Sequence, residues 1–264
     1  VLAFKNYSIR GGIWGSDWVG LDHFRNMFSD REFLRAIKNT VIFGIGGILL
    51  TMPCEIGLAL ILNEVRFRRS KKFIQTAVTF PHFISWVVLS GILVNLFSSV
   101  GVVNQLLMAF GLDTISPLTD AGAYRWFIWL SNIWKETGWG SIIYLSALSG
   151  VDSQLYEAAS IDGAGKWKQL LHVTLPGIAP TIIIMLILRM GSLMSMGYEK
   201  TILLYNPSTY ETADIISSYV YRAGLIEQDW SYSTAIGLFN SVINCILLFI
   251  TNQISKKTTE SSLW

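Results

Sequence analysis

Long apolar blocks constrain the fold of this chain more than any other feature. Crossing a bilayer core takes about 20 residues as a helix. Five blocks are long enough, at about residues 39–62, 73–97, 124–148, 178–196 and 233–254. Backbone N–H and C=O groups in hydrocarbon must pair within their own segment, which favours helices over open strands. The sequence therefore predicts an all-α fold, a polytopic membrane helix bundle.

The composition agrees with a membrane protein and excludes several other classes. Hydrophobic residues make up 52% of the chain and charged residues only 14%, whereas a soluble domain carries about 25% charge. The formal net charge of +2 gives no electrostatic support for nucleic-acid binding. The three histidines lie far apart and no Cys/His spacing indicates a metal site. Cys54 and Cys245 fall inside apolar blocks, where we expect them to be small buried hydrophobes.

Positive charge between the first two blocks orients the chain. Residues 66–72 read Arg-Phe-Arg-Arg-Ser-Lys-Lys, and such short basic loops stay in the cytoplasm. Counting crossings from there, we expect a transmembrane domain over 39–254, with the loop 150–176 and the tail 255–264 in the cytoplasm. Residues 1–38 and the loops at about 98–123 and 198–230 are then extracytoplasmic.

The cytoplasmic loop 150–176 has strong local signals for two short helices. Asp152 can cap a helix that runs to Ile161, and Gly163 can adopt the left-handed conformation that ends it. A second helix is expected over about 166–173. Pro176 should stop that helix, with Pro180 in the first turn of the next span.

The same loop carries a recognisable motif. It reads Glu157-Ala158-Ala159-Ser160-Ile161-Asp162-Gly163 and ends in Val173-Thr174-Leu175-Pro176. This resembles the EAA loop of ABC-importer permeases, with Val173 where that family often has Ile. The resemblance implies that the loop receives the motion of an ATPase subunit. It assigns ATPase coupling to a set of seven residues: Glu157, Ala158, Ala159, Asp162, Gly163, Leu175 and Pro176.

Further motifs resemble one branch of that superfamily. They are Trp18-Val19-Gly20-Leu21-Asp22-His23-Phe24, then Asn39-Thr40, Tyr205-Asn206-Pro207, residues 210–214 and residues 219–222. They resemble the MalF-like carbohydrate permeases and, within them, the LplB-like branch. The branch implies import of oligosaccharides or polysaccharide fragments across the plasma membrane of a bacterium. Members of the branch occur mostly in Gram-positive bacteria. A permease that begins outside with five spans is unusual, so we expect a sixth span before Val1.

The resemblance also implies partners. A second homologous permease would form a heterodimer with this chain, two ATPase subunits would bind ATP and Mg, and an external lipid-anchored solute-binding protein would deliver the sugar. This chain is then a transport subunit and not an enzyme, and it needs no cofactor of its own. The sequence agrees, since it has no GxxxxGK[ST] phosphate loop.

Polar and aromatic residues inside the predicted spans are candidates for the substrate path. Buried charges are costly in a membrane and usually face the bundle interior or a wet cavity. The candidates are Glu55, Trp86, Trp134, Lys135, Glu136, Trp139, Arg189, Asn240 and Asn244. Lys135 and Glu136 point about 100° apart on a helix, so each should find a partner elsewhere, with Glu55 as one possibility. Structural pairing and path lining both remain open. The tryptophans can stack on sugar rings or form an interfacial belt, and the asparagines can bind hydroxyls or join helices.

Two other classes of function compete with the permease. An ion-coupled secondary transporter or channel would use the carboxylates of Glu55 and Glu136. A membrane enzyme acting on lipid or glycan would need a cluster of His or Asp at the membrane surface, which the sparse histidines do not provide. In the external loop, Thr212 predicts the N-cap of a helix over about 213–223, and the loop can serve as a docking surface or as a lid.

Overall fold

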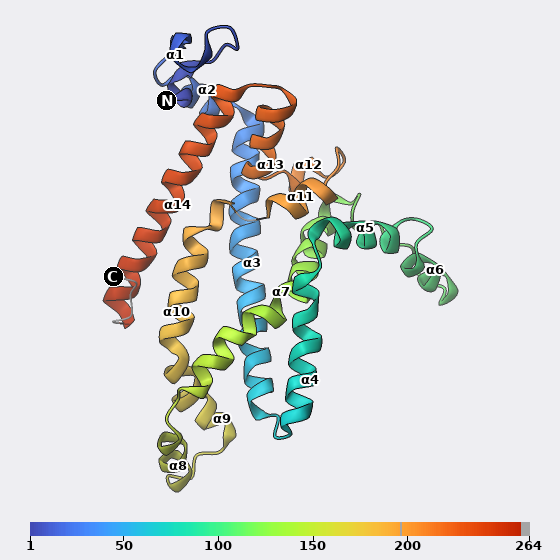
Figure 1. The fold of residues 1–264 in the computed structure, drawn as a ribbon. Coiled ribbons are helices and arrows are strands. Elements are labelled where there is room, and N and C mark those ends of the chain that lie inside the picture. Colours follow the sequence, from blue (N-terminus) through green and yellow to red (C-terminus); the bar gives the residue numbers. More distant parts are fainter. Residues whose placement is uncertain (196, 260–264) are drawn as a thin grey trace. The chain divides into compact units, whose positions relative to one another are not determined.

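The computed structural model describes residues 1–195 and 197–259 (Figure 1). Its regular structure is almost entirely helical, which confirms the predicted all-α class. The helices are α1 (Gly12–Gly15), α2 (Asp22–Ser29), α3 (Arg31–Glu64), α4 (Arg68–Thr79), α5 (Trp86–Phe97), α6 (Val102–Ala109), α7 (Ala121–Ser149), α8 (Ser153–Ile161), α9 (Lys166–Gln169), α10 (Leu175–Gly191), α11 (Tyr198–Leu204), α12 (Tyr210–Ala213), α13 (Ile216–Tyr221) and α14 (Trp230–Thr259). Turns of 3-10 helix occur at Leu2–Phe4, Phe80–Phe83 and Leu193–Ser195, and wider π-turns at Leu170–Thr174 and Arg222–Ile226. The short strands β1 (Lys5–Asn6) and β2 (Asp17–Trp18) pair antiparallel.

The chain divides into two compact units. Unit 1 comprises Val1–Gly46, Ser85–Trp129 and Gly191–Leu247, and unit 2 comprises Gly47–Ile84, Leu130–Met190 and the chain from Leu248 onward. The long helices α3, α7 and α14 contribute residues to both units, as does α10 through its last residue, Gly191.

Within the described residues, four segments are long and apolar enough to cross a membrane. They are Arg31–Glu64, the α5–α6 segment Trp86–Ala109, Lys166–Gly191 and Trp230–Lys257. The predicted third span forms the 29-residue helix α7, which is long enough to cross but falls outside this set. Lys135 and Glu136 near its middle lower its apolar character.

The second apolar block is not the single helix that the sequence predicts. It consists of α4, the 3-10 turn Phe80–Phe83 and α5. Pro81 has no N–H to give to the helix ladder. The Ser85 Oγ then accepts the N–H of Val88 at 3.3 Å and caps a new helix. The break therefore has a local cause inside a continuous apolar stretch.

The first span begins earlier than predicted. Helix α3 starts at Arg31, because the Asp30 carboxylate accepts the N–H of Glu32 at 2.8 Å and caps it. Residues 31–38 therefore belong to this helix and not to a separate N-terminal segment.

At the other end of the chain α14 continues to Thr259, so the part of the predicted tail 255–264 that the structure describes is helical. Residues 260–264 lie outside the described residues, as does Met196 at the end of the predicted fourth block.

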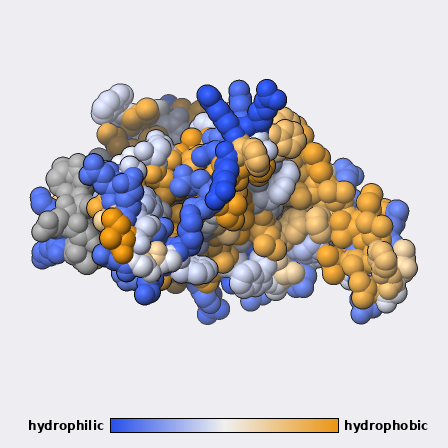
Figure 2. Space-filling model, turned by 90° about the horizontal axis from the view of Figure 1, so that it is seen from below, coloured by the Kyte–Doolittle hydropathy of each residue, from blue (hydrophilic) through white to orange (hydrophobic). Residues whose placement is uncertain are grey.

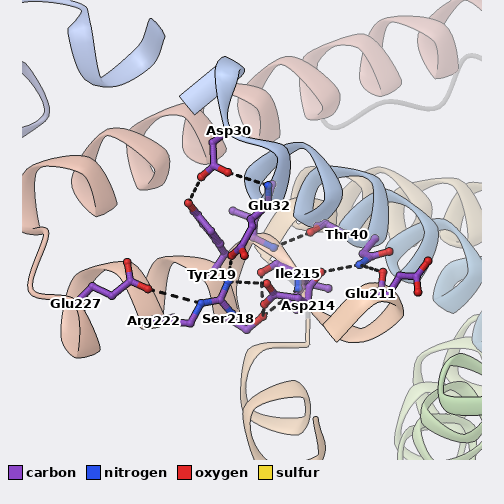
Figure 3. Close-up of polar contacts among 12 residues, drawn as sticks. Asp30, Glu32, Thr40, Glu211, Asp214, Ile215, Ser218, Tyr219, Arg222 and Glu227 are labelled. Carbon is purple, nitrogen blue, oxygen red and sulfur yellow. Dashed lines mark hydrogen bonds and ion pairs between the residues drawn. The ribbon is translucent and has the colours of Figure 1, made fainter. Parts of the chain in front are cut away.

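The predicted polar loop 198–230 is folded into helices in unit 1. Asp214 is fully buried and pairs with Arg222 at 2.9 Å, and Arg222 also reaches Glu32 at 2.9 Å (Figure 3). The hydroxyl of Tyr219 donates to Asp30. These contacts join the residues around α13 to the first turn of α3.

The ionisable groups of this network stabilise one another. Partial burial opposes ionisation of Asp30, but hydrogen bonds from the hydroxyl of Tyr219 and from backbone N–H groups hold its pKa below the usual value. Burial likewise disfavours the charge on Arg222, but the hydrogen bond and the charge of Asp214 raise its pKa above the usual value. Each side chain is therefore most stable in its charged form.

The predicted cap at Thr212 is wrong. Thr212 lies inside α12, and its hydroxyl donates to the carbonyl of Ala121 at 2.8 Å. Helix α13 instead begins at Ile216, where the Ser218 hydroxyl accepts the N–H of Ile215 at 2.9 Å. The Thr212 hydroxyl, which the sequence predicted as a helix cap, is therefore used in a tertiary hydrogen bond to Ala121 instead.

Much apolar surface remains uncovered in the single chain. Figure 2 shows broad hydrophobic areas with hydrophilic side chains projecting beside them. In the most apolar stretch of each of the four candidate spans, only between 11% and 33% of the residues are buried. Cys54 and Cys245, predicted to be buried, are both exposed, because they lie on helix faces that the described chain does not cover. Lipid or partner subunits must cover such surface.

Candidate coupling loop and polar sites in the membrane helices

The loop 150–176, called the coupling loop below, is held in shape by local signals in its sequence. The Asp152 carboxylate accepts the N–H of Gln154 at 2.9 Å and caps α8. Gly163 has φ +75°, and the N–H of Ala164 returns to the carbonyl of Ala159 at 2.8 Å. This left-handed glycine closes α8 as the sequence predicts.

Side-chain hydrogen bonds join the two halves of the coupling loop. The Gln169 amide donates to the Ser160 hydroxyl at 2.9 Å, and the hydroxyls of Tyr156 and Thr174 lie 3.0 Å apart. Thr174 is buried. Residues on α8 are thereby joined to the start of the following span.

The helix after Gly163 does not end at Pro176 as predicted. It runs from Lys166 through the π-turn Leu170–Thr174 directly into α10, and the combined helix spans Lys166–Gly191. Pro176 occupies the second position of α10 and Pro180 lies further inside it, beyond the first turn. The wider turn before Leu175 accommodates the missing N–H of Pro176 without ending the helix. The coupling loop is therefore continuous with a membrane span.

The seven predicted coupling residues all lie in unit 2, on this loop. Glu157, Ala158, Asp162, Gly163 and Pro176 are exposed, and Ala159 and Leu175 are partly buried. Large apolar side chains surround them, with Ile161 87% and Trp167 76% exposed. A cavity of about 640 Å³ adjoins the loop, lined by Leu60, Ile61, Asn63, Glu64, Tyr156, Lys166, Trp167, Gln169, Leu170 and Thr174. At its rim Lys166 forms an exposed ion pair with Glu64 of α3 at 3.0 Å.

A buried ion pair connects α3 and α10 in unit 2. The Arg189 Nη2 donates to both carboxylate oxygens of Glu55, at 2.7 and 2.6 Å, and the Glu55 side chain is only 2% exposed. Gly140 of α7 leaves room for it, since a Cβ there would lie 2.2 Å from the Glu55 carboxyl carbon. The suggested pairing of Glu55 with Lys135 or Glu136 is wrong, because Arg189 occupies the carboxylate.

A second polar cluster in unit 2 lies at the break after α4. The His82 Nδ1 is 2.7 Å from the Glu136 carboxylate, and Lys135 donates to the carbonyl of His82 at 2.5 Å. Lys135 and Glu136 approach each other only to 3.7 Å, a longer contact, as expected for neighbours on a helix. Trp139 stacks on the His82 ring with centroids 4.6 Å apart and planes at 4°.

The other path candidates lie in unit 1 or stand apart from these clusters. The ring of Trp86 has the Lys200 ammonium 5.7 Å from its centroid, whereas Trp134 of α7 is exposed. Asn244 donates to the Ser195 hydroxyl at 2.8 Å, and Asn240 lies 3.4 Å from the same oxygen. The nine candidates are therefore divided between the two units, and no single cluster contains them all.

Sequence reasoning missed His82 and Gly140. The signal for His82 was a polar residue directly after a proline inside an apolar block, where a helix break exposes main-chain carbonyls. Gly140 carried no signal of its own, because its role depends on which side chain approaches from α3. No group of three His, Cys, Asp or Glu side chains suited to a metal ion occurs among the described residues.

Comparisons with known proteins agree with this architecture. Residues 55–260 match the family model described as "Binding-protein-dependent transport system inner membrane component". Protein LplB of Bacillus subtilis (strain 168) is 44% identical over the whole chain and 83% of its own length. The polygalacturonan/rhamnogalacturonan transport system permease protein YteP of the same organism is 42% identical over the same shares.

A solved structure has the same fold. A chain in the crystal structure of a bacterial alginate ABC transporter, in complex with an alginate pentasaccharide-bound periplasmic protein, matches with a TM-score of 0.89 and 43% identity. The match covers 92% of this chain and 85% of that one. This chain therefore belongs to the family of inner membrane components of binding-protein-dependent transport systems.

Proposed function

We propose that this chain is the permease subunit of an ATP-driven ABC importer for oligosaccharides or polysaccharide fragments, and that it forms half of the translocation path. The exposed coupling loop that continues into a membrane span carries the proposal. The sugar class is supported by the relatives, since YteP is named for polygalacturonan and rhamnogalacturonan and the solved transporter for alginate.

The proposed assembly contains a second, homologous permease, two ATPase subunits and a lipid-anchored solute-binding protein. ATP and Mg bind the ATPases, which hydrolyse the nucleotide, and this chain contributes no catalytic group. The periplasmic protein in the alginate complex supports a binding-protein partner. The uncovered apolar faces of the spans fit a second permease. The Bacillus relatives favour the plasma membrane of a Gram-positive bacterium.

The coupling loop supplies a physical route from ATPase to membrane. Exposed carboxylates of Glu157 and Asp162 and the apolar side chains of Ile161 and Trp167 form the proposed contact with the ATPase. Hydrogen bonds inside the loop keep it rigid, and its helix passes without interruption into α10. Closure of the ATPases would thereby displace the span itself. The ion-coupled alternative is disfavoured, because its carboxylates, Glu55 and Glu136, are already engaged by Arg189 and His82.

Two glycines of the loop provide a matched test. Gly163→Val places a β-branched residue at φ +75°, where it is strained by about 1–3 kcal/mol. Gly165 has φ −70° and nothing within 4 Å of an added Cβ, so Gly165→Val is the control. In proteoliposomes of the assembled transporter, Gly163→Val should lower sugar-stimulated ATPase activity at least several-fold while Gly165→Val does not. Full activity of Gly163→Val would show that the loop is not the coupling element.

The proposed orientation places residues 66–72 and the coupling loop in the cytoplasm and the segment between α6 and α7 outside. Ser70 and Asp113 are both exposed and suit single-cysteine labelling after Cys54 and Cys245 are replaced. On intact cells a membrane-impermeant thiol reagent should label Asp113→Cys alone, and permeabilised cells should show both. Labelling of Ser70→Cys on intact cells would refute the orientation.

A further inference from the structure

A basic turn joins α3 to α4 in unit 2 and has no role in the coupling loop or in the polar sites of the spans. This basic turn, residues 66–72, contains five cations and no acidic residue, and the next acidic residue along the chain is Asp113. The nearest one before it, Glu64, already pairs with Lys166 at 3.0 Å. Within the described chain, no side-chain hydrogen bond or ion pair engages the five cations, which are Arg66, Arg68, Arg69, Lys71 and Lys72.

The position of these charges is unfavourable for the helix that carries them. Helix α4 begins at Arg68, so four of the five cations lie among its first five residues, and its first turn contains no acidic residue. The first turn of a helix is electropositive and favours acidic side chains. In α14, by contrast, Lys256 and Lys257 lie in the last turn, where the helix dipole favours cations. The charges of the basic turn therefore stabilise neither their own helix nor a neighbour in the described chain, which indicates an anionic partner outside it.

The basic turn lies at the depth of a membrane surface. The candidate span α3 ends at Glu64. From Arg68 to Lys72 the helix rises only about 6 Å, which matches the headgroup layer of one leaflet, about 5–8 Å deep. All the cations of α4 therefore fit within a single layer of lipid headgroups. Figure 2 views the molecule from the end at which α3 turns into α4 (Figure 1), and hydrophilic side chains project there beside hydrophobic surface.

Exposed aromatic rings flank the cations. Phe67 and Phe73 are 77% and 74% exposed, and Phe73 is turned about 140° around the helix from Arg68. A positive loop that only orients a span needs no such rings. Cations on one side and aromatic rings on the other form the pattern that binds the boundary between headgroups and acyl chains in anionic membranes.

A phospholipid suits this surface better than the ATPase does. The proposed ATPase contact is the coupling loop, whose exposed acidic side chains are Glu157 and Asp162. A protein surface complementary to those carboxylates is basic, whereas the partner of the basic turn must be negative. Clusters of four to eight Lys and Arg directly cytoplasmic of a span attract anionic lipids, and the basic turn has five.

We propose that the basic turn is a binding site for anionic phospholipids of the inner leaflet. Its arginines and lysines contact the headgroup phosphates, and Phe67 and Phe73 lie among the first acyl carbons. The inference goes beyond sugar import and does not depend on which sugar is carried. It requires the proposed cytoplasmic orientation of the turn, which the labelling of Ser70→Cys tests separately.

Phosphatidylglycerol binding to the assembled transporter, purified with its native partner subunits in a neutral detergent, tests the site. Native mass spectrometry across a lipid titration gives the affinity of the most tightly bound phosphatidylglycerol. Lys71→Gln with Lys72→Gln should weaken this binding about 30-fold, and added salt should weaken the wild type. Lys256→Gln with Lys257→Gln is the matched control, since it removes two lysines from the last turn of α14. Unchanged affinity in the first double variant, or an equal loss in both, would refute the site.

Photocrosslinking locates the bound lipid. In proteoliposomes of the assembled transporter, a phosphatidylglycerol with a photoreactive group near its glycerol should form adducts within residues 64–75. Excess phosphatidylglycerol should suppress these adducts, and soluble glycerol 1-phosphate should not. Suppression by glycerol 1-phosphate would identify a site for small anions instead of lipid. Absence of adducts from the assembled transporter would show that the ATPase or another subunit covers the turn, and either result overturns the proposal.

Discussion

Removing one partner of the Glu55–Arg189 pair should destabilise the chain far more than removing both. Arg189→Met leaves a carboxylate whose side chain is 2% exposed without its cation. Breaking such a buried pair costs about 3–5 kcal/mol, whereas replacing both charges by apolar groups is often neutral. Glu55→Met with Arg189→Met should therefore recover most of the loss. Together with Glu55→Met alone, these variants measure the coupling between the two residues.

Thermal unfolding of the purified transporter in detergent provides the assay. At about 2–4 °C per kcal/mol, Arg189→Met should lower the Tm by roughly 6–20 °C, and the double variant should return to within a few degrees of the wild type. The exposed pair of Lys166 and Glu64 is the control, and Lys166→Gln should cost less than about 1 kcal/mol. A double variant at least as unstable as Arg189→Met would refute the interpretation of a buried pair whose partners compensate each other.

Two further predictions concern packing and pH. Gly140→Ala would force its Cβ to within 2.2 Å of a buried carboxyl carbon and should cost about 1–3 kcal/mol by overpacking. Gly57→Ala, with nothing within 4 Å of its Cβ, should be neutral or stabilising in the same unfolding assay. Asp30 has a lowered pKa in the folded state, so its contribution to stability is present above the ordinary Asp pKa and is lost as the pH falls through the lowered value. Tyr219→Phe removes one donor to Asp30 and should shift this acid-induced loss to higher pH, which unfolding measured from pH 7 down to pH 3 would detect.

Local patterns in the sequence determined the class of the protein and the two ends of helix α8 in its coupling loop. Apolar blocks about 20 residues long can satisfy their backbone groups in a membrane only as helices, so the all-α fold followed from composition and length. The Asp152 cap and the left-handed Gly163 lie within a few residues of the helix ends they define. Such signals act within one turn of helix and need no knowledge of the rest of the chain.

Contacts between distant residues were decided only by the tertiary structure. Glu55 and Arg189 are 134 residues apart, and nothing in either segment distinguishes that pairing from one with Lys135. His82 meets Glu136 only because the chain turns after Pro81. Even the helix through Pro176 depended on a π-turn whose Thr174 bonds Tyr156 of another helix. Buried charges take whichever partner the packing of the helices brings within reach, and that packing depends on the complementarity of whole helix faces, which no local pattern encodes.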